Sequence, residues 1–116
     1  MTVSLTRGDI VLVPFPFTDL TSAKVRPAVI VNVVGEDLLV AFISSVIFSS
    51  HPGPTDFVLP ETHPDFSKTG LKRAGTFKLA KLLCLHQSLT LRRLGHVSPA
   101  IQRELDVKLA KAVGIA

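Results

Sequence analysis

The sequence predicts a mainly β fold of the α+β class: a small, strongly bent antiparallel sheet or barrel with one C-terminal amphipathic helix. The apolar runs are short, and glycine and proline residues separate them, which is typical of strands joined by turns. A clear helix start occurs at Ser98-Pro99, near the end of the chain. Because the 116 residues contain neither a repeat nor a linker, we expect a single domain over residues 1–116.

Two strands are predicted before residue 35. The first, Arg7–Phe15, contains Pro14 and is followed by Pro16. Proline has no N–H for a sheet ladder, so these residues indicate a strand end or a sheet edge. The second, Pro27–Val34, is almost continuously apolar and rich in β-branched residues, which predicts a central strand covered on both faces.

The middle of the chain predicts shorter strands. Leu38–Ile43 follows a polar turn and should pair with the preceding strand as a hairpin. A serine-rich segment leads to a short strand over Thr55–Leu59, and the loop that follows includes a candidate helical turn at Pro64–Lys68. Two further strands, Gly75–Leu79 and Lys81–Leu85, are expected with a kink or bulge between them.

The end of the chain predicts helical structure. Leu89–Leu94 is interpreted as a short helical turn before Gly95. Ser98 is suited to the N-cap and Pro99 to the first helical position. One apolar stripe follows, made of Ile101, Leu105, Leu109, Ala112 and Val113.

Composition favours a packed domain and a polyanionic partner. With 47% hydrophobic residues and a mean hydropathy of +0.42, the chain can form a core, which argues against disorder. The net charge of +4 is unevenly distributed. Residues 1–67 hold three Lys/Arg and seven Asp/Glu, whereas residues 68–116 hold ten Lys/Arg and two Asp/Glu. This asymmetry indicates a basic face for a polyanion, although a solvated surface without a partner would look the same.

Several function classes lack support. No apolar run approaches the roughly 20 residues of a membrane-spanning helix, and no signal peptide is apparent, so we expect a cytoplasmic protein without membrane contact. Cys84 is alone, which excludes an internal disulfide and favours a small buried apolar residue. The four histidines do not have metal-site spacing, so no metal ion and no cofactor are expected.

Four segments resemble, in order, the MazF/PemK family of endoribonuclease toxins from type II toxin–antitoxin systems. They are GDIVLVPF at Gly8–Phe15, RPAVIV at Arg26–Val31, AFISS at Ala41–Ser45, and Thr69–Leu82 with its TGLK and GTFKLAKL. Together they span most of the chain. The resemblance implies an SH3-like barrel with a terminal helix, acting as a homodimer that holds RNA in a basic groove.

The resemblance also implies an activity and a partner. The protein should cleave single-stranded RNA, such as mRNA, at selected sequences without a metal ion, leaving 2′,3′-cyclic phosphate and 5′-hydroxyl ends. A cognate antitoxin should neutralise it by folding an acidic tail into the groove.

Arg26 matches the position of the family's catalytic arginine, and Ser44 that of its catalytic Thr/Ser. Such a reaction uses the RNA's own 2′-hydroxyl as nucleophile and needs charge stabilisation at phosphorus. The planar guanidinium suits that task because it can donate two hydrogen bonds to phosphate oxygens. From the residues alone, Arg26 could instead pair with an acid such as Asp19, and Ser44 could be an ordinary turn residue.

Seven polar residues are candidates for RNA contact because they lie in the matching loops and strand ends. They are Thr21, Ser22, Lys24, Ser45, Lys72, Arg73 and Lys78. Some family members carry an acid two residues after the basic residue that Lys78 matches, where this chain has Ala80. The absent acid puts an aspartate general base in doubt.

Two alternatives follow. The first is a module of the same fold that has lost catalysis and only binds RNA or antitoxin, which the alanine at position 80 favours. The second is the gyrase-poisoning branch of the fold, which acts by protein binding. The Arg26-Pro27 motif argues against that branch, because the gyrase-poisoning proteins work through their C-terminal residues and not through an arginine of the second strand.

Overall fold

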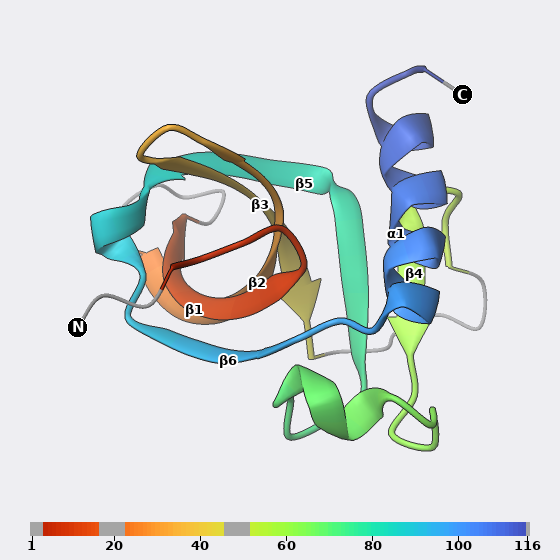
Figure 1. Cartoon of the computed structure of the whole chain (residues 1–116). Coiled ribbons are helices and arrows are strands. Elements are labelled where there is room, and N and C mark those ends of the chain that lie inside the picture. The colour runs from red at the N-terminus through yellow and green to blue at the C-terminus, as the bar shows by residue number, and fades with distance from the viewer. Residues whose placement is uncertain (1–3, 17–22, 46–51, 116) are drawn as a thin grey trace.

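The computed structural model describes residues 4–16, 23–45 and 52–115. These form a curled antiparallel sheet with strand order β4-β5-β3-β2-β1-β6 and one C-terminal helix (Figure 1). The predicted fold class is therefore confirmed. The elements in chain order are β1 (Asp9–Pro16), β2 (Ala23–Val34), β3 (Asp37–Ser44), β4 (Asp56–Leu59), the 3₁₀ helix η1 (Phe66–Thr69), β5 (Gly75–His86), the 3₁₀ helix η2 (Gln87–Leu89), β6 (Arg92–His96) and α1 (Pro99–Ala112).

Strand β2 is central, and its middle, residues 28–31, is buried on both faces, as the apolar run predicts. Val29 and Val31 belong to one hydrophobic cluster, which we call the helix-side core because it includes residues of α1. Ala28 and Ile30 belong to a second cluster, the barrel core, with residues of β1, β3 and β5. The sheet therefore separates two cores, and its side chains alternate between them.

Pro14 and Pro16 lie at a sheet edge, as predicted. Strand β6 pairs with Asp9–Leu12 of β1, and among the described residues the rest of β1 pairs on the β2 side alone. The carbonyl of Leu12 accepts a hydrogen bond from the Leu91 N–H at 2.9 Å on the β6 side. By alternation, residues 14 and 16 face this same outer side, where a missing N–H breaks no ladder.

Strand β5 is continuous, so the prediction of two separate strands is wrong, whereas the predicted bulge is confirmed. Lys78 pairs with Phe42 and Leu82 with Ala41, which leaves Leu79–Lys81 without partners on β3. The extra residues bend the strand without ending it, and β5 turns a corner in Figure 1.

The helical turn predicted at Leu89–Leu94 is wrong. Only Gln87–Leu89 forms a 3₁₀ turn, and β6 begins at Arg92. The reason is tertiary: the edge of β1 offers unpaired backbone groups, and pairing with them outweighs local helical spacing.

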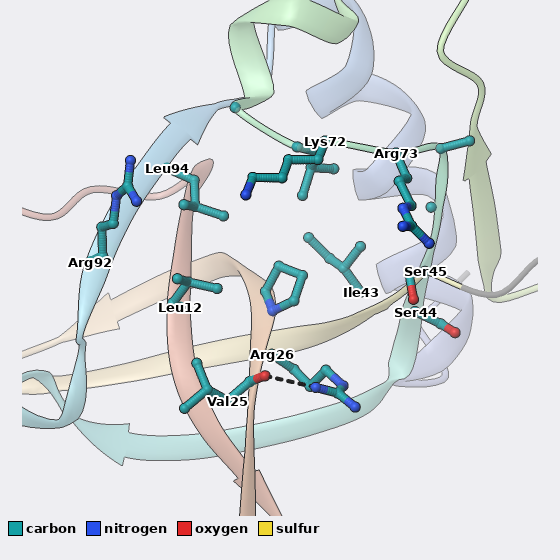
Figure 2. Close-up of a pocket in the computed structure, with 15 residues that line it drawn as sticks. Leu12, Val25, Arg26, Ile43, Ser44, Ser45, Lys72, Arg73, Arg92 and Leu94 are labelled. Carbon is teal, nitrogen blue, oxygen red and sulfur yellow. Dashed lines mark hydrogen bonds between the residues drawn. The ribbon is translucent and has the colours of Figure 1, made fainter.

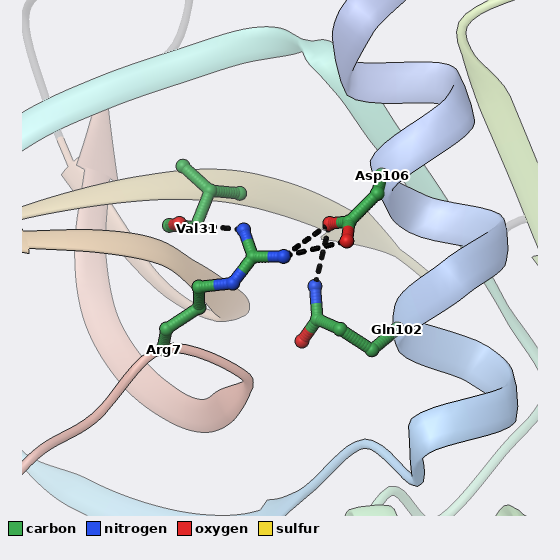
Figure 3. A network of polar contacts seen from close by, with 4 residues as sticks. All are labelled: Arg7, Val31, Gln102 and Asp106. Carbon is green, nitrogen blue, oxygen red and sulfur yellow. Dashed lines mark hydrogen bonds and ion pairs between the residues drawn. The ribbon is translucent and has the colours of Figure 1, made fainter.

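Helix α1 begins as predicted, with the Ser98 Oγ accepting from the Ile101 N–H at 3.3 Å. Ile101 and Leu105 are buried against the sheet, whereas Val113, expected on the apolar stripe, remains half exposed. Arg7 ties this helix to the start of β1 (Figure 3). Its Nη2 lies 2.6 Å from both carboxylate oxygens of Asp106.

Cys84 is exposed, so the prediction of a buried thiol is wrong. In the second half of β5, it is Leu85 that packs in the barrel core, and Cys84 lies on the opposite face. Within the described ranges, no helix is both long and apolar enough to cross a membrane.

Candidate functional site

A cavity of about 500 Å³ opens where β2, β3, β6 and the segment before β5 meet. This volume lies within the usual range of ligand pockets, roughly 300–1,000 Å³. Its apolar lining continues the helix-side core: Ile43 belongs to that core, and the partly buried Leu71 and Leu94 pack against it. The lining residues described are Leu12, Val25, Arg26, Pro27, Ile43, Ser44, Ser45, Gly70, Leu71, Lys72, Arg73, Ala74, Gly75, Arg92 and Leu94.

Strand β2 positions Arg26. The residue lies opposite Val13 of β1, and pairing with β3 begins only two residues later, at Ala28. The missing N–H of Pro27 is tolerated because this part of β2 has no β3 partner in register. The Arg26 Nη1 donates to the Val25 carbonyl at 3.0 Å, as Figure 2 shows. Arg26 is thus extended, as predicted, within a strand that starts earlier than expected.

The two serines lie at the end of β3. Ser44 is half-buried opposite Thr76 of β5, and Ser45 is exposed immediately after it. Both line the cavity on the side of Arg73 (Figure 2). Ile43, one residue earlier, is fully buried and fixes the end of the strand over the helix-side core.

The segment between η1 and β5 carries Lys72 and Arg73, both exposed at the cavity. Gly70 ends η1 with φ of 72° and lies against β6. A Cβ at Gly70 would overlap the Leu94 carbonyl oxygen, and one at Gly95 would overlap the Lys68 carbonyl. Two glycines thus let η1 and β6 touch through their backbones, which fixes the cationic segment relative to the sheet.

Sequence reasoning missed Arg92 and Leu94, because they lie on the strand that was interpreted as a helical turn. Both line the cavity from β6. One signal was available: a glycine such as Gly95, between Leu94 and His96, can mark a strand position where another backbone approaches closely.

Five of the nine predicted site residues therefore meet at one cavity: Arg26, Ser44, Ser45, Lys72 and Arg73. Two others are placed elsewhere. Lys24 is exposed opposite Phe15 and does not line the cavity. The Lys78 Nζ lies 3.9 Å from an Asp56 carboxylate oxygen, also outside the cavity. Thr21 and Ser22 lie outside the described residues.

The cavity is cationic. Among the described residues that line it there are three arginines and a lysine but no Asp, Glu or His. Several acids are instead engaged elsewhere, Asp9 by Arg93 and Asp106 by Arg7. Such a site can bind phosphate groups through guanidinium and ammonium donors, and it can offer serine hydroxyls to a bound ligand. In the described ranges, no group of three or more His, Cys, Asp or Glu side chains could hold a metal ion.

Comparison with known proteins gives the family. Residues 6–113 match the model described as PemK-like, MazF-like toxin of type II toxin-antitoxin system. The chain belongs to this toxin family. The match covers nearly the whole toxin, including every described residue of the cavity.

Solved structures share the toxin's fold at low sequence identity. MazF from Deinococcus radiodurans is 18% identical, with a TM-score of 0.73 over 97% of this chain and 99% of that one. The MazE-MazF structure from the same organism is 16% identical, with a TM-score of 0.72 over 99% of this chain and 100% of that one. An endoribonuclease in complex with its cognate antitoxin, from a Mycobacterial species, is 17% identical, with a TM-score of 0.72 over 97% of this chain and 98% of that one. None of the curated proteins matches the toxin in sequence.

Proposed function

We propose that this toxin is an endoribonuclease that binds single-stranded RNA at the cationic cavity and cleaves it without a metal ion. The observation that carries the proposal is the convergence of Arg26, Ser44, Lys72 and Arg73 from separate segments on one cavity. The family match and the fold shared with a Mycobacterial endoribonuclease support it. The expected substrate is mRNA in the cytoplasm.

The proposed reaction is an internal displacement at phosphorus. The 2′-hydroxyl loses its proton, and its oxygen bonds to phosphorus while the bond from phosphorus to the 5′-oxygen breaks. The leaving 5′-oxygen takes up a proton, so the products carry a 2′,3′-cyclic phosphate and a 5′-hydroxyl. Arg26 stabilises the charge that develops on the phosphate oxygens, and Ser44 orients the 2′-hydroxyl or donates to a phosphate oxygen.

We assign no residue of this chain as the general base. Ala80, at the position of the acid in some family members, is exposed on β5 and does not line the cavity. The described lining residues offer no carboxylate or imidazole for the task.

The same cavity is the proposed site of antitoxin binding. An acidic, disordered antitoxin tail would pair with Lys72, Arg73 and Arg26 and thereby exclude RNA. Solved complexes of a MazE-MazF pair and of an endoribonuclease with its antitoxin support such a partner. We further propose that two toxin chains form a homodimer with a shared groove.

The test is incubation of the purified toxin with a long single-stranded RNA in EDTA, followed by mapping of the new 5′ ends. Cleavage at a small set of sequences, with 5′-hydroxyl ends, is expected. RNA that stays intact although it binds would favour the second candidate, a binding module of the same fold. The described cavity lining favours that candidate in one respect, because it provides no general base.

A further inference from the structure

Three residues from neighbouring strands form a row across the sheet beside the cavity. Leu12 of β1 is paired with Pro27 of β2 on one side and with Arg92 of β6 on the other. Directly paired residues project from the same face of a sheet, so Arg92 shares the cavity face with Leu12 and Pro27. All three line the cavity.

The next residue along β6 faces the other way. Arg93 is paired with Val11, and its Nη2 lies 3.2 Å from the buried carboxylate of Asp9. The guanidinium of Arg93 is therefore engaged in an ion pair within the protein. Arg92 is exposed, and it forms no ion pair with any described residue. Of these two adjacent arginines, Arg92 is the one placed to meet a ligand.

Arg92 and Arg26 lie on different sides of the cavity, with Leu12 between them in Figure 2. Because Pro27 and Arg92 are two strand spacings apart, their backbones are separated by roughly 10 Å. Leu12 and Leu94, beside Arg92, carry no side-chain hydrogen-bonding group. The two guanidinium groups therefore suit two different phosphates of one strand, with an apolar surface between them for a sugar or base.

We propose that Arg92 is a substrate-binding residue that contacts the phosphate adjacent to the cleaved one. This inference rests on the proposed endoribonuclease function. Because the contact is remote from the reacting phosphorus, it stabilises bound substrate and transition state alike. Loss of the contact therefore raises KM and changes kcat little.

The test uses short RNAs that contain one mapped cleavage site, in which a single neighbouring phosphate is replaced by an uncharged methylphosphonate. For the wild type, replacement of the contacted phosphate should lower kcat/KM by roughly ten-fold or more. Arg92→Ala should cause a similar loss on unmodified RNA. In Arg92→Ala, the same replacement should lower kcat/KM little further, because the substitution and the methylphosphonate each remove the same contact between Arg92 and the phosphate.

Arg103→Ala is the matched control, since Arg103 is an exposed arginine on α1 outside the cavity. It should show the full wild-type sensitivity to methylphosphonate. The inference would be overturned if the loss caused by Arg92→Ala and the loss caused by methylphosphonate were additive at each of the two phosphates next to the cleaved one. The endoribonuclease function would remain intact in that case. A wild type that cleaves none of these RNAs would overturn the endoribonuclease function itself, and the Arg92 contact with it.

Discussion

Arg26 is the residue on which the proposed chemistry depends most directly. We expect Arg26→Ala to lower cleavage by about 10²- to 10³-fold, the usual cost of removing one preorganised donor to a developing oxyanion. Arg26→Lys should recover little, because lysine keeps the charge but loses the planar fork. Single-turnover cleavage assays on one RNA measure both effects. Wild-type rates for a correctly folded Arg26→Ala would refute the catalytic role.

Ala80 tests whether an acid in this segment is needed. It is exposed within the β5 bulge, and neighbouring Lys78 already lies 3.9 Å from Asp56. We therefore expect Ala80→Asp to leave cleavage unchanged or to lower it modestly, because a new carboxylate adds negative charge without reaching the cavity. Rates for both proteins from mildly acidic to mildly basic pH provide the measurement. An inert wild type that becomes active as Ala80→Asp would support the binding module instead.

At the level of single residues, the family resemblance pointed to Arg26 and Ser44 because each lies in a matching segment, RPAVIV or AFISS, and both residues line the cavity. Arg92 could not be found in this way, because its place depends on pairing between β6 and β1, which are far apart in the sequence. Lys78 shows the converse limit. Its position on β5 was predicted, but its partner Asp56 comes from a different strand, and no local pattern reports such a contact.

The contact between η1 and β6 holds the cationic segment in place, and two glycines allow its effect to be isolated. Gly70 and Gly35 both have positive φ, 72° and 61°, but only Gly70 lies against another backbone. Gly35→Ala should cost roughly 1–2 kcal/mol of stability, for the left-handed backbone alone. Gly70→Ala should cost about 1–3 kcal/mol more, because its Cβ meets the Leu94 carbonyl.

Urea unfolding of the two variants measures this difference, and cleavage assays measure its effect on the site. Gly70→Ala should lose activity under conditions in which it remains folded. The added Cβ pushes η1 away from β6, and Lys72 and Arg73, which follow η1, move away from the cavity with it. Equal unfolding midpoints for the two variants would show that the backbone contact does not hold the segment.

Among the elements, those with strong local signals were predicted well. Helix α1 has a cap, a proline and an apolar stripe, and β2 has a continuous apolar run. The bulge in β5 was predicted, but the continuation of the strand through it and the edge pairing of β6 were not, since both are decided by the neighbouring strands. The sequence therefore predicted the sheet more reliably than the wall of the cavity that β6 provides.

For the whole molecule we expect a stable homodimer. Large apolar side chains remain exposed on the described surface, among them Leu91 at 62% and Val25 at 45%, and the latter lines the cavity. Association would remove such surface from water and bring two cavities into one groove. Sedimentation at micromolar concentration should give the mass of two chains. A monomer throughout would remove the shared groove, although cleavage by that monomer would leave the chemistry unaffected.

The prolines at the outer edge of β1 matter when many copies of the chain meet. Beyond Leu12, no strand of the described ranges pairs with this edge, and an open edge is a template on which another copy can add a strand and begin to aggregate. Residues 14 and 16 would supply the two outward N–H donors for such growth, and proline supplies neither. Because β6 is short, it leaves this part of the β1 edge uncovered. The two prolines therefore protect the uncovered edge against the addition of strands from other copies.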